Sequence, residues 1–253
     1  IVHDLNVISE TAERLGKKAD ADRYRRQMEA TTEAYIRKFV SKKGIVAKDY
    51  QSAYIMALKF VLPEGELREQ VKKNFAANIR KNGLQTGFFA TEHLLPLLVE
   101  AGETELAYDI LLQEGCPGWM YQVKCGATTT WERWDALKPD GTVNEEKMAG
   151  SGDNMVSFNH YAFGSVGEFY YQYILGIKPQ KPGFAELHFE PYPDRRLGGV
   201  SGSYLSRAGK IESSWKYEED GCHISLNTPV KSEVVLPDGK KETVEAGTYQ
   251  WLC

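Results

Sequence analysis

The sequence predicts a mainly α-helical protein that ends in a β domain, and two observations carry this prediction. Apolar residues recur every three or four positions through residues 1–176, which is the spacing of one face of a helix. Four prolines then lie between residues 179 and 193, and the chain that follows alternates apolar and polar residues as half-buried strands do. Because helical pairs followed by strands are typical of separate domains, we expect a helical domain over residues 1–176 and a β domain over residues 177–253.

The helices of the first domain follow from the apolar spacing and from the residues that stop each helix. Gly16, Pro63 and the pair Asn82-Gly83 are stop signals, because proline cannot continue a helix and glycine adopts the left-handed conformation that ends one. A last helix is expected to begin after Ser157, whose side chain is a good N-cap. The predicted helices span residues 5–15, 24–39, 51–61, 64–81, 88–101, 104–113 and 158–175.

These helices fall into antiparallel pairs, which indicates part of a closed ring of helical hairpins or of an α-solenoid. The sequence has no repeat of fixed period, and this disfavours a solenoid. A closed double ring needs more helices than the sequence predicts, so we expect the chain to hold only the second half of one.

The second domain is predicted to be an antiparallel β module. The pair Asp238-Gly239 favours a tight hairpin turn, because both residues tolerate the positive φ that such turns require. Apolar and polar residues alternate over 185–189, 210–217, 223–226 and 232–236.

The composition excludes several classes of function. The 253 residues are enough to bury a core without disulfides or metals. A net charge of −4 offers no basic surface to nucleic acid or to an acidic membrane, and no run of 18 apolar residues is present to span a bilayer. The chain begins at Ile1 without a methionine or a signal-peptide pattern, so we expect a piece of a longer protein, with the cytoplasm favoured as its compartment.

The four cysteines do not form a metal-binding pattern. None of them lies in Cys-x-x-Cys spacing, and no histidine lies at zinc-ligand spacing from them. We expect free thiols that are mostly buried, with a disulfide between Cys116 and Cys125 only in an oxidising compartment. No metal or organic cofactor is predicted.

The segment of residues 115–155 is predicted to be an irregular loop with a function. Loops of this length usually bind or catalyse, and the tryptophans here argue against disorder. Within the segment, Glu132 lies between Trp131 and Trp134. Because indole faces pack against sugar rings and a carboxylate beside them can accept a proton from water, the cluster predicts a carbohydrate-active site.

Each residue of this cluster also has a structural interpretation. Glu132 is either a general base or the partner of a cation such as Arg133 in a buried ion pair. Arg133 and Asp135 are expected to organise the loop. If the segment is an extended strand, Trp131 and Trp134 point to opposite faces, so that one lines a cleft and the other packs into the core.

A second cluster of polar and aromatic residues covers residues 157–168 and contains His160. A neutral imidazole both donates and accepts hydrogen bonds, so His160 suits contact with sugar hydroxyls, although a histidine among aromatic residues is more often part of a core. Acid–base hydrolysis of a glycoside needs two carboxyl groups, and Asp153 is the rival within the chain for the second. Glu92 and His93 are expected to cap and to pack.

The two clusters resemble motifs of the α-L-rhamnosidases of glycoside hydrolase family 78. Residues 126–135 match that family's Gly-Ala-Thr-Thr-x-Trp-Glu-Arg-Trp-Asp loop, and residues 157–168 match its Ser-Phe-Asn-His-Tyr-Ala-x-Gly-Ser-Val-Gly-Glu segment. Smaller matches lie at residues 51–54, 86–88 and 117–119. Two long motifs in the right order are far more specific than a Trp-Glu pair alone.

The resemblance implies a catalytic (α/α)6 barrel followed by a β-sandwich, and hydrolysis of terminal α-L-rhamnosides with inversion. It implies that Glu132 is the general base and that His160 contacts the sugar, while Trp131 and Trp134 flank the base as candidate substrate contacts. The general acid of the family lies in the first half of the barrel, which has no counterpart in this chain. The implied partners are therefore a rhamnose-containing glycoside and the missing N-terminal part of the same enzyme.

Two other functions stay open at this point. The chain is alternatively a non-catalytic module that binds carbohydrate through the aromatic loop, or a piece of another (α/α)6 hydrolase with a different sugar preference. Fold alone does not decide the substrate.

Overall fold

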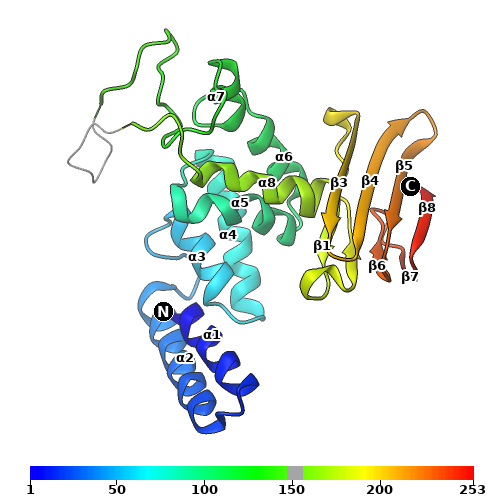
Figure 1. Cartoon of the computed structure of the whole chain (residues 1–253). Helices are drawn as coiled ribbons and strands as arrows, with labels where there is room; N and C mark the ends of the chain where they lie inside the picture. Colours follow the sequence, from blue (N-terminus) through cyan, green and yellow to red (C-terminus); the bar gives the residue numbers. More distant parts are fainter. Residues whose placement is uncertain (147–155) are drawn as a thin grey trace. The chain divides into compact units, whose positions relative to one another are not determined.

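A computed structural model describes residues 1–146 and 156–253 (Figure 1). The chain divides into two compact units, Ile1–Phe163 and Gly164–Cys253, and each is described by itself. None of the helices in the described ranges has both the length and the apolar character needed to cross a bilayer.

The first unit consists of helical hairpins. The helix α1 packs against α2, α3 packs against both α4 and α5, and α5 packs against α6 (Figure 1). The expected order of helices is confirmed, and a short helix, α7, begins within the segment that we predicted to be irregular. The helices are α1 (Val2–Arg14), α2 (Lys18–Phe39), α3 (Gln51–Phe60), α4 (Glu66–Asn82), α5 (Phe88–Glu100), α6 (Thr104–Leu112) and α7 (Trp119–Lys124).

The helix α5 is the most buried of these elements. Its central residues Leu94, Leu95, Leu97 and Leu98 are all inaccessible to solvent, so the helix is apolar around most of its circumference. A helix of this kind belongs to the interior of an assembly of helices rather than to its outer layer. Its first residue, Phe88, follows a loop that the functional site uses.

The prediction of a helix that begins after Ser157 is wrong. Residues 157–161 are not helical, and the Ser157 hydroxyl accepts a hydrogen bond from the Asn159 N–H at 3.2 Å instead of capping a helix. The helical segment begins with a 3₁₀ turn at Ala162–Ser165, continues as α8 (Val166–Phe169) and ends in a π-helical turn at Tyr170–Ile174. Because residues 157–160 are not helical, their backbone groups are available to another segment.

The second unit contains two four-stranded sheets, with the strand orders β1-β2-β6-β7 and β3-β4-β5-β8. Phe189 of β2 and Trp251 of β8 stack across the two sheets with ring centroids 6.0 Å apart, as expected for a β-sandwich. The strands are β1 (Ile177–Pro179), β2 (Leu187–Phe189), β3 (Gly199–Ser206), β4 (Gly209–Glu218), β5 (Gly221–Thr228), β6 (Ser232–Val235), β7 (Lys241–Val244) and β8 (Gly247–Leu252).

The alternation in the sequence accounts for the strands that were predicted. In β4, the side chains of Ile211, Ser213 and Trp215 are buried, and those between them face outward. Gly239 has a φ of 86° in the turn that joins β6 to β7, as the Asp-Gly pair predicted. One detail differs from the antiparallel expectation, because β2 and β6 pair in parallel. The strands β1, β3, β7 and β8 lay outside the predicted ranges.

Candidate functional site

The two sequence clusters lie side by side, joined by backbone hydrogen bonds. The His160 N–H donates to the Thr130 carbonyl at 2.9 Å, and the Glu132 N–H donates to the Ser157 carbonyl at 2.9 Å. The Thr130 hydroxyl adds a bond to the His160 carbonyl at 2.6 Å. These bonds act like a short antiparallel ladder, so the position of Glu132 along one segment determines its position relative to His160 on the other.

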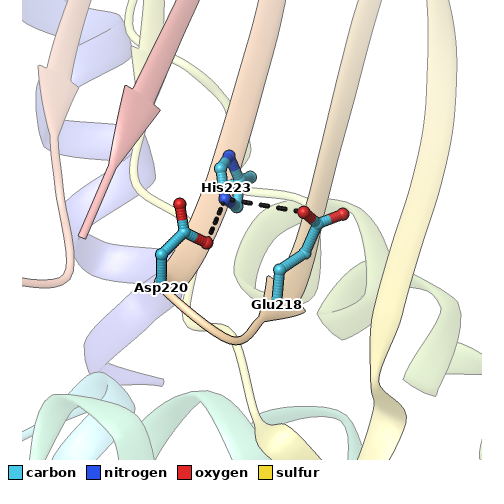
Figure 2. Close-up of side chains that lie close together, drawn as sticks. All are labelled: Glu218, Asp220 and His223. Carbon is cyan, nitrogen blue, oxygen red and sulfur yellow. Dashed lines mark hydrogen bonds and ion pairs between the residues drawn. The ribbon is translucent and has the colours of Figure 1, made fainter.

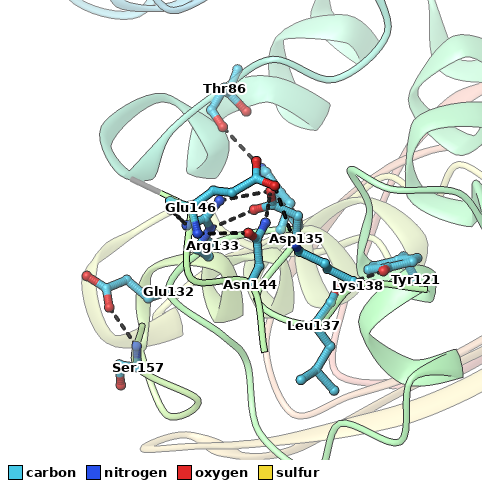
Figure 3. Close-up of polar contacts among 11 residues, drawn as sticks. Thr86, Tyr121, Glu132, Arg133, Asp135, Leu137, Lys138, Asn144, Glu146 and Ser157 are labelled. Atoms are coloured by element: carbon cyan, nitrogen blue, oxygen red, sulfur yellow. Dashed lines mark hydrogen bonds and ion pairs between the residues drawn. The ribbon is translucent and has the colours of Figure 1, made fainter. Parts of the chain in front are cut away.

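The Glu132 carboxylate is held by one backbone group. Its Oε2 accepts a hydrogen bond from the Ser157 N–H at 2.7 Å, and the side chain is half-buried (Figure 3). Within residues 1–146 and 156–253, its other oxygen has no hydrogen-bonding or ionic partner. The arrangement orients the carboxylate and leaves one oxygen available to a water molecule or a ligand.

The alternative role for Glu132, an ion pair with Arg133, is wrong. Arg133 donates two hydrogen bonds to Asp135, from Nε to Oδ1 at 2.7 Å and from Nη2 to Oδ2 at 2.9 Å (Figure 3). Its Nη1 donates to the Glu146 carbonyl at 2.7 Å, and Asn144 donates to Asp135 at 2.7 Å. Arg133 is buried, so this two-pronged pair ties the loop together, as the structural interpretation of both residues expected.

The charges of this pair stabilise each other. The hydrogen bonds and positive charge of Arg133 lower the pKa of Asp135, and the Asp135 carboxylate raises the pKa of Arg133. Both groups are therefore ionised at neutral pH. Since Arg133 is occupied in this way, it does not neutralise the Glu132 carboxylate.

Both tryptophans beside Glu132 are buried. Trp131 is 3% exposed, lies edge-on to Phe158 and packs with Tyr121 and Ala136. Trp134 is 9% exposed and stacks on Phe163, with ring centroids 3.7 Å apart and planes within 8°. The bends of residues 131–136 replace the extended strand that would point the two indoles to opposite faces. A contact between either indole and a sugar stays a prediction.

The indole of Trp134 links the loop to the helices. Its Nε1 donates to the Thr86 carbonyl at 3.2 Å, just before α5 begins. Trp119, the first residue of α7, lies edge-on to Trp134 at 5.0 Å and donates its own Nε1–H to the Phe163 carbonyl at 2.9 Å. Trp119 is thus a core residue.

His160 is fixed by a hydrogen bond and by two aromatic rings. Its Nδ1 accepts a hydrogen bond from the Ala162 N–H at 3.3 Å, which places the ring proton on Nε2 in the neutral imidazole. The ring stacks on Phe88, with centroids 4.7 Å apart, and on Tyr161, with centroids 5.2 Å apart. The Nε2–H is consequently a hydrogen-bond donor of defined direction.

The other candidate residues do not join this site in the described ranges. Asp153 lies outside the residues that the structure describes. Glu92 is exposed on α5, and His93 is half-buried beside Phe60, with ring centroids 5.3 Å apart. Burial lowers the pKa of His93, in keeping with the packing role that was expected.

Two residues that support the site were not predicted from the sequence. Gln122 of α7 is 3% exposed, and its Oε1 accepts a hydrogen bond from the Trp131 N–H at 3.2 Å. Asn144 is also buried and donates to Asp135. A single polar residue in a short helix or loop carries no local signal that it will be buried, so one sequence could not identify either of them.

One group of side chains in the described residues has the composition of a metal site. Glu218, Asp220 and His223 gather at the hairpin between β4 and β5 (Figure 2). His223 Nε2 lies 2.8 Å from Asp220, which raises the pKa of His223, and Lys216 lies 2.9 Å from Glu218. The group is exposed and already balanced by its own ion pairs, so we assign no metal to it. The four cysteines are free thiols, as expected, but only Cys222 is buried, so the expectation that they are mostly buried is wrong.

The chain is similar to known families along nearly its whole length. Residues 1–174 match the model of the bacterial alpha-L-rhamnosidase six-hairpin glycosidase domain. Residues 176–250 match the model of the bacterial alpha-L-rhamnosidase C-terminal domain.

Curated relatives carry the same name over a much longer chain. An alpha-L-rhamnosidase from an Alteromonas species is 36% identical over 233 residues, which are 90% of this chain and 25% of the relative. An alpha-L-rhamnosidase from Streptomyces avermitilis is 33% identical over 247 residues, which are 96% of this chain and 23% of the relative. The chain therefore spans about a quarter of the length of these relatives.

Solved structures give the same result. The native alpha-L-rhamnosidase of Aspergillus terreus aligns with a TM-score of 0.89 at 30% identity, covering 99% of this chain and 29% of that one. The Streptomyces avermitilis alpha-L-rhamnosidase, crystallised in complex with L-rhamnose, aligns with a TM-score of 0.89 at 30% identity, covering 98% of this chain and 26% of that one.

Proposed function

Because this chain belongs to the family of bacterial α-L-rhamnosidases, we propose that it is the C-terminal piece of an enzyme that hydrolyses terminal α-L-rhamnosides with inversion. Residues 1–176 supply the second half of the catalytic barrel, and residues 177–253 supply the C-terminal β-sandwich. The complex of the Streptomyces avermitilis relative with L-rhamnose supports the choice of sugar. The partner of the chain is the N-terminal part of the same protein.

The single observation that carries the proposal is the state of the Glu132 carboxylate. In the part of the chain that the structure describes, it is oriented by one backbone N–H, no cation pairs with it, and its second oxygen has no hydrogen-bonding partner. A general base needs this combination, because it must be fixed in direction and still accept a proton. Glu132 is assigned this role.

In the reaction, Glu132 removes a proton from a water molecule, and the water oxygen bonds to the anomeric carbon opposite the leaving group. The bond from that carbon to the glycosidic oxygen breaks, and a carboxylic acid in the N-terminal part gives its proton to the departing oxygen. Inversion places the two carboxyl groups roughly 6.5–9.5 Å apart, which leaves room for the water. The reactants are the glycoside and water, with no cofactor.

His160 is assigned to the sugar. Its Nε2–H is directed by the bond that Nδ1 accepts from Ala162, and it donates to a rhamnose hydroxyl. Trp131 and Trp134 border the base on either side along the chain, and their burial restricts any sugar contact to an indole edge. Their main contribution is to hold the Glu132 segment in position.

The test is the Glu132→Gln variant of the complete enzyme, with this chain alone as the blank. We expect kcat to fall by about 10²–10⁴-fold, the usual contribution of general base catalysis, while the fold is kept. Glu146→Gln is the matched control, because its carboxylate lies in the same loop and its side chain is largely exposed. Near-normal turnover of Glu132→Gln would remove the assignment. Proton NMR of the first-formed rhamnose tests inversion, which predicts the β anomer.

A further inference from the structure

Tyr161 is an exposed aromatic ring attached directly to the proposed sugar contact. Its side chain is 86% exposed, although its ring stacks on His160 with planes within 12°. A tyrosine side chain is usually at least partly buried in the protein. Here only one face of the ring packs against another residue. The other face is open in the described residues.

The ring packs on a stack of aromatic side chains. His160 stacks on Phe88 at 4.7 Å, and Phe88 in turn lies 5.8 Å from Phe163, the partner of Trp134 in the core. Tyr161 is thus the outermost ring of a stack that is anchored in the first unit. A ring held in this way loses little conformational freedom when a ligand packs on it.

The pairing of the two segments places this ring next to the proposed sugar contact. Glu132 bonds to Ser157, and His160 bonds to Thr130 two residues before Glu132, so Tyr161 follows directly after the paired segment. With inversion, the base acts on the face of the sugar opposite the leaving group, and Tyr161 lies beyond His160 on the side away from Glu132. Sugar and aryl rings share an apolar face that packs on an aromatic side chain.

From these observations we infer that Tyr161 forms a subsite for the leaving group of the rhamnoside, by stacking on a ring of that group. The inference rests on the proposed function and extends it from the rhamnose to the group bonded to it. The occupant is a ring with an apolar face, and its two sources are an aryl aglycone and a second sugar. The tyrosine hydroxyl is not required, because the stacking uses the ring.

The experiment compares three substrates in the complete enzyme and its Tyr161→Ala variant. α-L-Rhamnosyl fluoride has no ring in its leaving group, 4-nitrophenyl α-L-rhamnoside has an aryl ring, and a rhamnosyl-glucose disaccharide has a sugar ring. We expect Tyr161→Ala to lower kcat/KM by about five- to tenfold more for a ring-bearing substrate than for the fluoride, mostly through KM. The aryl and sugar arms identify which ring is preferred.

Two variants make the result specific. Tyr161→Phe keeps the ring and is expected to restore the preference for ring-bearing substrates. Tyr204→Ala removes an exposed tyrosine of the second unit and is expected to leave all three substrates unaffected.

An equal loss for all three substrates would overturn the inference, because Tyr161 would then act by positioning His160. An equal loss of kcat/KM together with a lower midpoint of thermal unfolding would also overturn it, because Tyr161 would then pack against another part of the enzyme. No loss for any substrate would also overturn it. Turnover of the fluoride by the wild-type enzyme reports on the proposed function separately, so the two ideas fail in different ways.

Discussion

Trp134 offers the sharpest test of how the loop is held, because one side chain makes three kinds of contact. It stacks on Phe163, meets Trp119 edge-on and donates a hydrogen bond to the Thr86 carbonyl. We compare Trp134→Ala, which removes all three contacts, with Trp134→Phe, which keeps a ring for stacking and loses the hydrogen bond.

The structure gives the expected magnitudes. Replacement of a buried tryptophan by alanine costs about 3–5 kcal/mol, because apolar contacts are lost and a cavity is left. Trp134→Phe leaves the carbonyl of Thr86, a buried residue, without its donor, at a cost of about 1–3 kcal/mol. The two variants therefore differ in the free energy of unfolding by about 2 kcal/mol.

The assay is urea unfolding followed by circular dichroism, with stability taken from the midpoint and slope. Trp215→Phe in the second unit is the matched control, since this buried indole also donates to a backbone carbonyl, that of Ile174, at 2.7 Å. Both phenylalanine variants are expected to lose stability. At urea concentrations below those that unfold the complete enzyme, only Trp134→Phe is expected to lower kcat, because Trp134 lies two residues from Glu132.

Two results would refute this reasoning. If Trp134→Ala were no less stable than Trp134→Phe, the stack on Phe163 would contribute nothing. If Trp134→Phe kept full kcat, the hydrogen bond to Thr86 would not position the Glu132 segment.

Two further predictions concern ion pairs. Asp135→Asn leaves the buried Arg133 without its carboxylate partner, and we expect the free energy of unfolding in urea to fall by about 1–3 kcal/mol. This is less than the cost for a fully buried pair, because Asp135 is partly exposed. Asp140→Asn in the same loop should cost much less, and an equal loss in both variants would contradict the prediction. The hydrogen bond from His188 and the nearby Lys178 lower the pKa of Glu190 from 4.5 to about 2. Because the folded-state pKa is depressed, the carboxylate's stabilising contribution is complete above about pH 4.5 and is lost as the pH falls towards 2. The urea midpoint of the wild type should therefore approach that of Glu190→Gln across this window, and a constant difference between the two would contradict the assignment.

The amino-acid pattern was sufficient for the local elements and for the family. Helical spacing and stop signals act over a few residues, so the six helices from α1 to α6 were predictable to within about three positions, except that α2 begins six residues before its predicted start. The Asp238-Gly239 turn was predictable for the same reason. The two aromatic and polar motifs pointed to α-L-rhamnosidases before any fold was known, because each is long enough to be specific.

Weak local signals accounted for the elements that were missed. The strand β3 consists largely of glycine, serine and exposed residues, so it shows little of the alternation that marks a half-buried strand. Ser157 has the residue type of an N-cap, but its backbone pairs with Glu132 instead. A competing contact 25 residues away outweighed the local preference.

What the sequence by itself determined is therefore the helices α1 to α6, the presence of a β module and the two motifs that supply the candidate site residues. Only the tertiary structure decided how those residues are used. It paired Arg133 with Asp135 and not with Glu132, it buried both Trp131 and Trp134, and it left Tyr161 exposed on His160. The physical reason is that these outcomes depend on bends in an irregular loop and on hydrogen bonds between distant segments, which no periodic pattern of side chains encodes.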